Sequence, residues 1–142
     1  MIYLDNCATT RPRPEVVAAV ARTMAEEFGN PSSLHRLGLR AEKLVKEARN
    51  RTADFLKVQE SEIYFTSGGT ESNNIVVQGI ASLKSSKGKH IVTTSIEHPA
   101  IMNTLKYLEK KGFEITWLKN DHYGRIDINE LKESLREDTI LV

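Results

Sequence analysis

Apolar residues recur every three or four positions in several stretches of the chain, and each such stretch predicts an amphipathic helix. The clearest stripe lies in residues 37–55, where Glu42 and Lys46 add a supportive charge pair four residues apart. Another stripe begins at Pro14, a residue suited to a first helical turn, and ends before the glycine and proline of residues 29–31. Further helices are expected at residues 75–83, 99–111 and 127–135.

Short β-type runs alternate with the later helices. They occupy residues 63–65, 91–94, 115–118 and 139–142. Strands and helices that alternate through short connections predict the α/β class, with a mostly parallel sheet flanked by helices. The first two helices precede this alternation, so we expect them to form a separate layer or part of a second subdomain. The expected divisions are an arm at 1–13, a helical segment at 14–60 and an α/β region at 61–142.

The last residues of the chain are apolar, which is unusual for the end of a domain. Ile140, Leu141 and Val142 form the end of a predicted buried strand, whereas domain ends are usually exposed and often polar. We therefore expect the chain to be an incomplete part of a longer protein. The alternative is a complete domain that ends in an edge strand.

Charge and composition exclude several classes of protein. The 142 residues include 20 Lys+Arg and 19 Asp+Glu, and a net charge of +1 gives no electrostatic case for nucleic-acid or membrane binding. No apolar run approaches the ~20 residues of a membrane span, and residues 1–20 lack the pattern of a signal peptide, so a cytoplasmic location is predicted. The single cysteine, Cys7, excludes a disulfide framework within the chain, and the scattered histidines predict no metal site.

Residues 63–74 are the stretch that most strongly suggests chemistry. They are expected to form a strand, a glycine turn and the start of a helix, a junction where α/β proteins bind ligands. Gly69 would let a ligand approach the backbone, Thr70 adds a hydroxyl donor, and a helix N-terminus favours an anion such as phosphate. The spacing matches neither a Walker loop nor the Gly-x-Gly-x-x-Gly motif. A tight turn without a ligand remains the alternative.

Two further residues invite a functional interpretation. His98 follows the next predicted strand and precedes a helix, where its imidazole could stack on a ring or move protons. The alternative is a histidine that only caps the helix. Cys7 has no neighbouring base or cation in the sequence that would activate a nucleophile, so a packing role is the better interpretation.

Five motifs carry a family resemblance, at residues 2–10, 28–35, 65–73, 97–100 and 138–142. In this order they resemble the N-terminal third of a cysteine desulfurase, a pyridoxal-phosphate (PLP) enzyme of fold type I grouped with the class V aminotransferases. The resemblance implies the first part of the large cofactor domain, with an N-terminal segment that packs on the small domain and an arm near the active-site mouth.

The resemblance also implies roles for the candidate residues. The backbone of Gly69 and the side chain of Thr70 would bind the cofactor phosphate, and His98 would stack on the pyridine ring and assist proton transfer. The family removes sulfur from L-cysteine, leaves L-alanine, and carries the sulfur as a persulfide on a separate catalytic cysteine. The sulfur would serve iron–sulfur cluster assembly or tRNA thiolation, with an iron–sulfur scaffold protein as one acceptor, and the full-length enzyme would be a homodimer.

Two catalytic groups of the family have no counterpart in these residues. The Schiff-base lysine and the catalytic cysteine belong to the later two-thirds of the family, and Cys7 does not match the latter. The chain alone is therefore predicted to be inactive. Other interpretations are a selenocysteine lyase or an aminotransferase of the same class, a non-catalytic fragment that acts as a binding or interaction module, and a nucleotide-phosphate binder.

Overall fold

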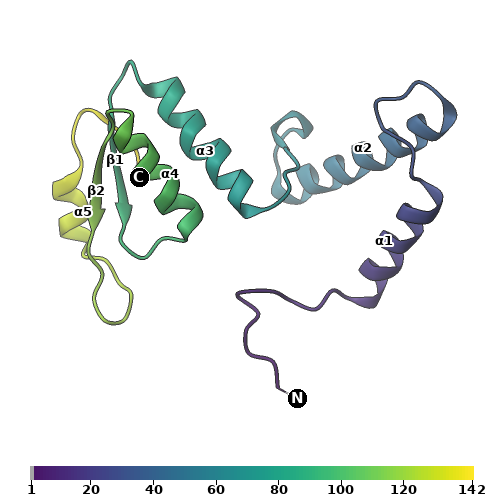
Figure 1. Cartoon of the computed structure of the whole chain (residues 1–142), viewed down its shortest axis with the longest axis horizontal. Coiled ribbons are helices and arrows are strands. Elements are labelled where there is room, and N and C mark those ends of the chain that lie inside the picture. Colours follow the sequence, from purple (N-terminus) through teal and green to yellow (C-terminus); the bar gives the residue numbers. More distant parts are fainter. Residues whose placement is uncertain (1) are drawn as a thin grey trace. The chain divides into compact units, whose positions relative to one another are not determined.

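The computed structural model describes residues 2–142. Internal contacts divide the chain into two compact units, one that ends at Tyr64 and one that comprises Phe65–Val142. Figure 1 labels the α-helices of both units and the strands β1 and β2. Among the described residues, no helix combines the length and the apolar character that crossing a bilayer requires.

The N-terminal unit is helical. It contains α1 (Pro14–Glu26), α2 (Arg36–Leu56) and a short 3-10 turn, η1 (Glu60–Glu62) (Figure 1). Proline opens α1, and the Nδ1 atom of His35 caps α2 by accepting a 3.3 Å hydrogen bond from the Gly38 N–H. Both predicted helices of this region are confirmed.

The first turn of α2 makes a close backbone approach that requires glycine. Gly38 is buried, and a Cβ atom at this position would overlap the carbonyl oxygens of Ser33 and Asn30 in the preceding loop. Apart from Gly38, the buried residues of α2 are the small Ala41 and Ala53, and α1 has no buried residue. The apolar stripes of these helices are therefore largely unpartnered within this unit.

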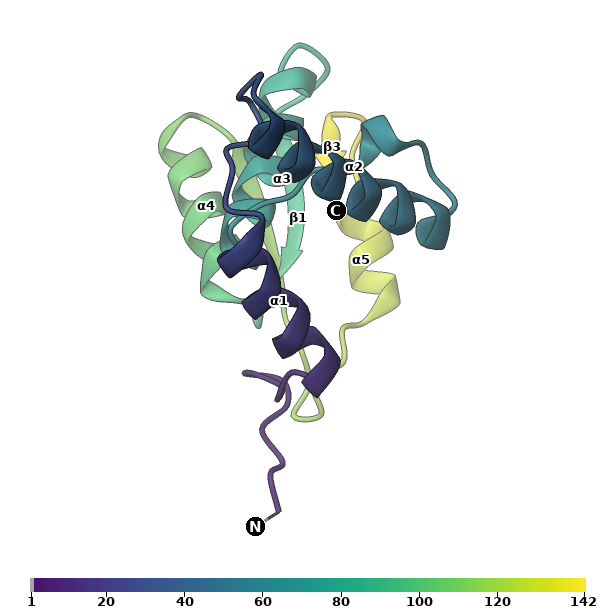
Figure 2. The same cartoon turned by 90° about the vertical axis from the view of Figure 1, so that its right-hand side faces the viewer.

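The C-terminal unit is an α/β layer structure. Its elements in order are α3 (Gly69–Lys84), β1 (His90–Thr94), α4 (Pro99–Lys110), β2 (Glu114–Leu118), α5 (Ile128–Ser134) and β3 (Thr139–Leu141). The three strands are parallel in the order β2-β1-β3, so β1 is central. Figure 2 shows α4 and α5 on opposite sides of β1. The predicted parallel sheet flanked by helices is confirmed.

The hydrophobic core lies between the sheet and the pair α3 and α4. Val77 and Ala81 of α3, Ile91 of β1, and Leu105 and Leu108 of α4 form one buried cluster. Ile91 and Val92 of the central strand are buried and Thr93 and Thr94 are half-buried, which explains why residues 91–94 are β-branched throughout instead of alternating with polar residues. The helix α4 ends at Lys110, and Gly112 follows it with a φ of 86°, the left-handed conformation that glycine adopts readily after a helix.

A surface ion-pair network joins the beginnings of the two outer strands. Arg136 donates two parallel hydrogen bonds to the Glu114 carboxylate, at 2.8 and 2.9 Å, and a third of 3.1 Å to Asp138. The hydrogen bonds from the Arg136 guanidinium lower the pKa of Glu114 from its ordinary value. The same bonds to the Glu114 carboxylate raise the pKa of Arg136 above its ordinary value. The network therefore holds the beginnings of β2 and β3 together across β1.

The prediction of a strand at residues 63–65 is wrong. Ile63 closes the 3-10 turn through its N–H to the Glu60 carbonyl, and its own carbonyl accepts a hydrogen bond from Arg49 Nε. Tyr64 is 82% exposed. A strand needs a neighbouring strand to satisfy its backbone groups, and no described strand pairs with this run. Local β propensity alone did not reveal that condition.

Candidate functional site

The N-terminus of α3 has free space in front of its first backbone N–H groups. Gly68 is the cap residue and has no side chain to bond the N–H groups of Gly69 and Thr70, both of which are exposed. A Cβ atom on Gly68 or Gly69 would meet nothing within 4 Å. The Thr70 hydroxyl belongs to the same first turn. Unbonded N–H groups, a helix dipole and an open approach together fit a phosphate group.

The loop that precedes α3 is held by side chains of the helix itself. Glu71 Oε2 accepts a 2.6 Å hydrogen bond from the Ser67 N–H, and Thr66 Oγ1 lies 2.7 Å from Ser72 Oγ. The backbone hydrogen bond from Ser67 keeps the pKa of Glu71 below its usual range. The loop is therefore folded back onto the first helical turn.

Sequence reasoning missed Glu71. The signal that could have revealed it is its place as the third helical residue after Gly68, where a glutamate commonly turns back toward the residues before a helix.

His98 caps α4, as the interpretation of this residue as a helix cap predicted. Its Nδ1 atom accepts a 3.1 Å hydrogen bond from the Ala100 N–H, and its side chain is exposed. The bond requires a lone pair on Nδ1, so the neutral ring carries its proton on Nε2. Because this hydrogen bond lies in the ring plane, the two faces of the imidazole are not used by the cap.

The helices α3 and α4 bring the two predicted motifs to one end of the unit. The single hydroxyl proton of Thr104 on α4 is shared between Asn74 Oδ1 on α3 and the Ala100 carbonyl, each 2.8 Å from Thr104 Oγ1. A hollow of about 310 Å³, here called the α3–α4 hollow, lies between the helices. Thr70 lines it, as do Pro99 and Ala100, which directly follow His98. The structure thus places the Gly69–Thr70 turn and the His98 cap at neighbouring helix N-termini.

The sheet topology makes this edge a natural place for a ligand. The chain leaves β1 for β2 on one side and returns from β2 to β3 on the other side. Ligands of open α/β sheets bind beyond the carboxyl ends of the strands at such a reversal. His98 follows the carboxyl end of β1 within a few residues. The candidate site therefore lies where this architecture leaves a crevice.

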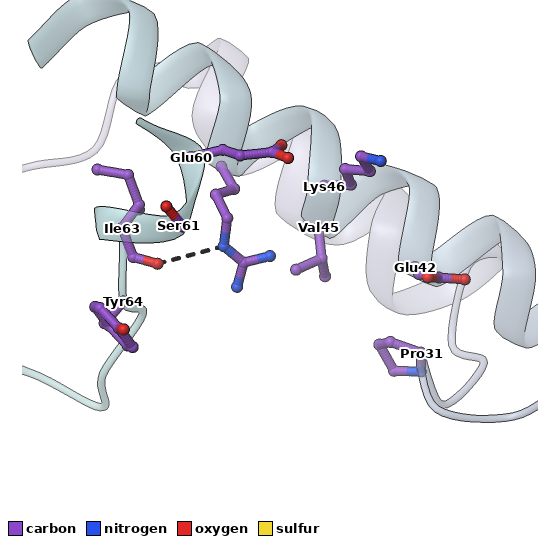
Figure 3. Close-up of a pocket in the computed structure, with 9 residues that line it drawn as sticks. Pro31, Glu42, Val45, Lys46, Glu60, Ser61, Ile63 and Tyr64 are labelled. Carbon is purple, nitrogen blue, oxygen red and sulfur yellow. Dashed lines mark hydrogen bonds between the residues drawn. The ribbon is translucent and has the colours of Figure 1, made fainter. Parts of the chain in front are cut away.

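Another hollow, of about 520 Å³, lies in the N-terminal unit along α2. Figure 3 shows that Val45 and Lys46 come from α2, whereas Glu60 and Ile63 come from the segment that follows it. Arg49 Nε donates a 3.3 Å hydrogen bond to the Ile63 carbonyl. None of the predicted site residues lines this hollow. Cys7 also belongs to the N-terminal unit, where it is exposed in a turn of the arm.

The comparison with known proteins defines the class of this chain. The family profile described as Aminotransferase class-V matches residues 2–142, and the chain belongs to that family. Within the class, it resembles the N-terminal third of cysteine desulfurases, as the sequence motifs predicted.

The similar proteins include sequences and solved structures. The chain is 50% identical over 141 residues to the cysteine desulfurase IscS of Methanosarcina thermophila. This match covers 99% of this chain and 35% of that protein. The chain is 48% identical to the IscS of Dictyoglomus turgidum, over 99% of this chain and 36% of the relative. A solved NifS-like protein matches with a TM-score of 0.86 and 38% identity, over 93% of this chain and 36% of its own.

A second solved structure, of SspA in complex with cysteine, matches with a TM-score of 0.83 and 35% identity. The match covers 93% of this chain and 38% of the SspA chain. The chain thus spans about a third of the length of the relatives that it matches.

Proposed function

We propose that this chain forms the phosphate-binding part of a PLP-dependent cysteine desulfurase. The complete enzyme would convert L-cysteine to L-alanine and hold the released sulfur as a persulfide. The observation that carries the proposal is the open N-terminus of α3 at Gly68–Thr70, beside the His98 cap of α4. The names of the relatives support the reaction, and the solved complex of SspA with cysteine supports the substrate.

The described residues fit the cofactor phosphate. The N–H groups of Gly69 and Thr70 and the Thr70 hydroxyl would hold it, and Gly68 leaves the approach open. When bound, PLP supplies an electron sink for chemistry at the substrate amino acid. His98 would contribute a ring face for stacking and the Nε2 atom as a position that holds or gives a proton. The Nδ1 cap would keep that ring in a fixed orientation.

Other parts of the proposal rest on the resemblance. The Schiff-base lysine and the catalytic cysteine would lie outside these 142 residues. The arm at 1–13 would lie near the active-site mouth, and the segment at 14–60 would accompany the small domain. The whole enzyme would be a cytoplasmic homodimer that gives sulfur to an acceptor such as an iron–sulfur scaffold protein.

The phosphate site can be tested by comparing PLP with pyridoxal, which lacks the phosphate. The test uses the full-length enzyme that contains this chain and measures both affinities by absorbance titration. Thr70→Val should reduce the preference for PLP by roughly ten- to a hundredfold, since a hydrogen bond to a charged group contributes about 1.5–3 kcal/mol. Thr23→Val, on exposed α1, is the matched control. An unchanged preference in Thr70→Val, or no alanine from L-cysteine with the unaltered enzyme, would contradict the proposal.

A further inference from the structure

We propose that Asn74 and Thr104 are positioning residues that align the phosphate-binding turn of α3 with the His98 ring on α4. This inference rests on the proposed function, because the alignment matters only if both groups act on one bound cofactor. It adds a role for two residues that do not themselves touch the cofactor.

Asn74 connects its own helix to the neighbouring one. It lies one helical turn after Thr70, and its Nδ2 donates a 2.9 Å hydrogen bond to the Thr70 carbonyl. Its Oδ1 accepts from Thr104 Oγ1 at 2.8 Å and from Gln78 Nε2 at 2.9 Å. These bonds fix the amide in one orientation. The position of the Thr70 backbone is thereby tied to a residue of α4.

Thr104 continues the connection toward His98. Its side chain is buried, with 4% of its surface exposed, and its hydroxyl lies 2.8 Å from the Ala100 carbonyl as well as 2.8 Å from Asn74. Ala100 is the residue whose N–H is bonded to His98 Nδ1. A short series of contacts therefore runs from Thr70 through Asn74, Thr104 and Ala100 to the imidazole.

The Asn74–Thr104 hydrogen bond adds a constraint that the apolar contacts between α3 and α4 do not supply. Val77, Ala81 and Leu105 pack together in the core, but hydrophobic contact is non-directional and tolerates small shifts along the helix axis. Asn74 and Thr104 are each the sixth residue of their helix, so their bond holds the two N-termini level with each other. A misplacement of about 1 Å can reduce turnover by about a hundredfold.

Thr104→Val is the decisive variant, because valine keeps the shape of threonine and removes only the hydroxyl. In the full-length enzyme with PLP bound, it should change the circular dichroism of the cofactor band, which reports the ring orientation. It should also lower kcat by about tenfold while KM for L-cysteine changes less than about twofold. The preference for PLP over pyridoxal should stay, since the first turn of α3 is intact. Thr104→Ser should restore both signals.

The matched control is Thr52→Val. Thr52 makes the same hydroxyl bond to the carbonyl four residues earlier, at 2.9 Å to Ala48, and lies on α2 of the N-terminal unit, which contains none of the candidate site residues. If Thr104→Val does not fold, Asn74→Ala carries the same expectation, with Asn129→Ala, at an exposed position of α5, as its control. Unchanged cofactor dichroism and kcat in the folded variant would overturn the positioning role. If the unaltered enzyme does not prefer PLP to pyridoxal, the proposed function fails, which is a distinct result.

Discussion

The Nε2 atom of His90 lies 2.8 Å from the Thr116 hydroxyl on the neighbouring strand. On its other side, Nδ1 lies 2.7 Å from Thr139 Oγ1, so one imidazole links β1 to both outer strands. The His90 side chain has no exposed surface. Because a hydroxyl either donates or accepts, the two threonines satisfy the ring in either neutral tautomer. A polar residue can therefore occupy the buried centre of this sheet.

Replacing His90 by phenylalanine should destabilise the protein by about 1–3 kcal/mol. The change removes two hydrogen bonds from the buried ring to the half-buried Thr116 and Thr139 hydroxyls, and each such bond contributes about 0.5–1.5 kcal/mol. Urea unfolding followed by circular dichroism measures the effect. His122→Phe, at an exposed loop position, should change stability by less than about 0.5 kcal/mol. Equal stability of the two variants would show that the cross-strand bonds contribute nothing.

Leu105→Ala should cost about 2–5 kcal/mol of unfolding free energy. Leu105 is 1% exposed in the cluster between α3, α4 and the sheet, and truncation leaves a cavity in that core. Leu83→Ala is the control, since Leu83 is 81% exposed on α3. The same denaturant titration distinguishes them. A loss below about 1 kcal/mol in Leu105→Ala would mean that this cluster is not the core.

Two helical glycines should respond in opposite ways to alanine. Gly38→Ala forces a Cβ atom onto the carbonyl oxygens of Ser33 and Asn30, so it should destabilise the N-terminal unit and displace the loop before α2. Gly79→Ala meets no atom within 4 Å in α3 and should stabilise the protein by about 0.5–1 kcal/mol. Thermal unfolding of both variants checks this. A stabilising Gly38→Ala would contradict the described close approach.

Stability should fall in acid partly through Glu71. Its pKa is lowered in the folded protein, chiefly by the hydrogen bond from the Ser67 backbone N–H, so the unfolded chain binds its proton first. The contribution is present above the ordinary carboxyl pKa and is lost as pH falls through the lowered value. Denaturant titrations from neutral to about pH 3 should show a weaker pH dependence in Glu71→Gln. Ser67→Ala keeps the backbone donor and should retain most of the dependence.

Cys7 should be dispensable for sulfur release. It is exposed in the N-terminal arm, and the family resemblance would place the catalytic cysteine outside these 142 residues. In the full-length enzyme, Cys7→Ser should leave the production of alanine and sulfide within a few-fold of the parent. Loss of the persulfide while the cofactor remains bound would identify Cys7 as the nucleophile after all.

Local signals in the sequence predicted most of the secondary structure. Periodic apolar residues and Pro14 marked helices and their beginnings, because these features act within one or two turns. The β-type run at 63–65 was the failure, since strand formation depends on a distant partner. Within the site, the turn at Gly69–Thr70 had a local signature. The Asn74–Thr104 bond joins residues 30 positions apart, and no local pattern reveals it.

The neighbouring N-termini of α3 and α4 have a consequence for how an anion is attracted. Among the described residues, those that line the α3–α4 hollow carry no charged side chain. Any positive potential from these helix ends comes from aligned peptide groups, which have no pKa and cannot lose a proton. An ammonium group would weaken as it is deprotonated, whereas peptide dipoles do not titrate. The part of the attraction that the helix ends supply should therefore follow the ionisation of the phosphate itself.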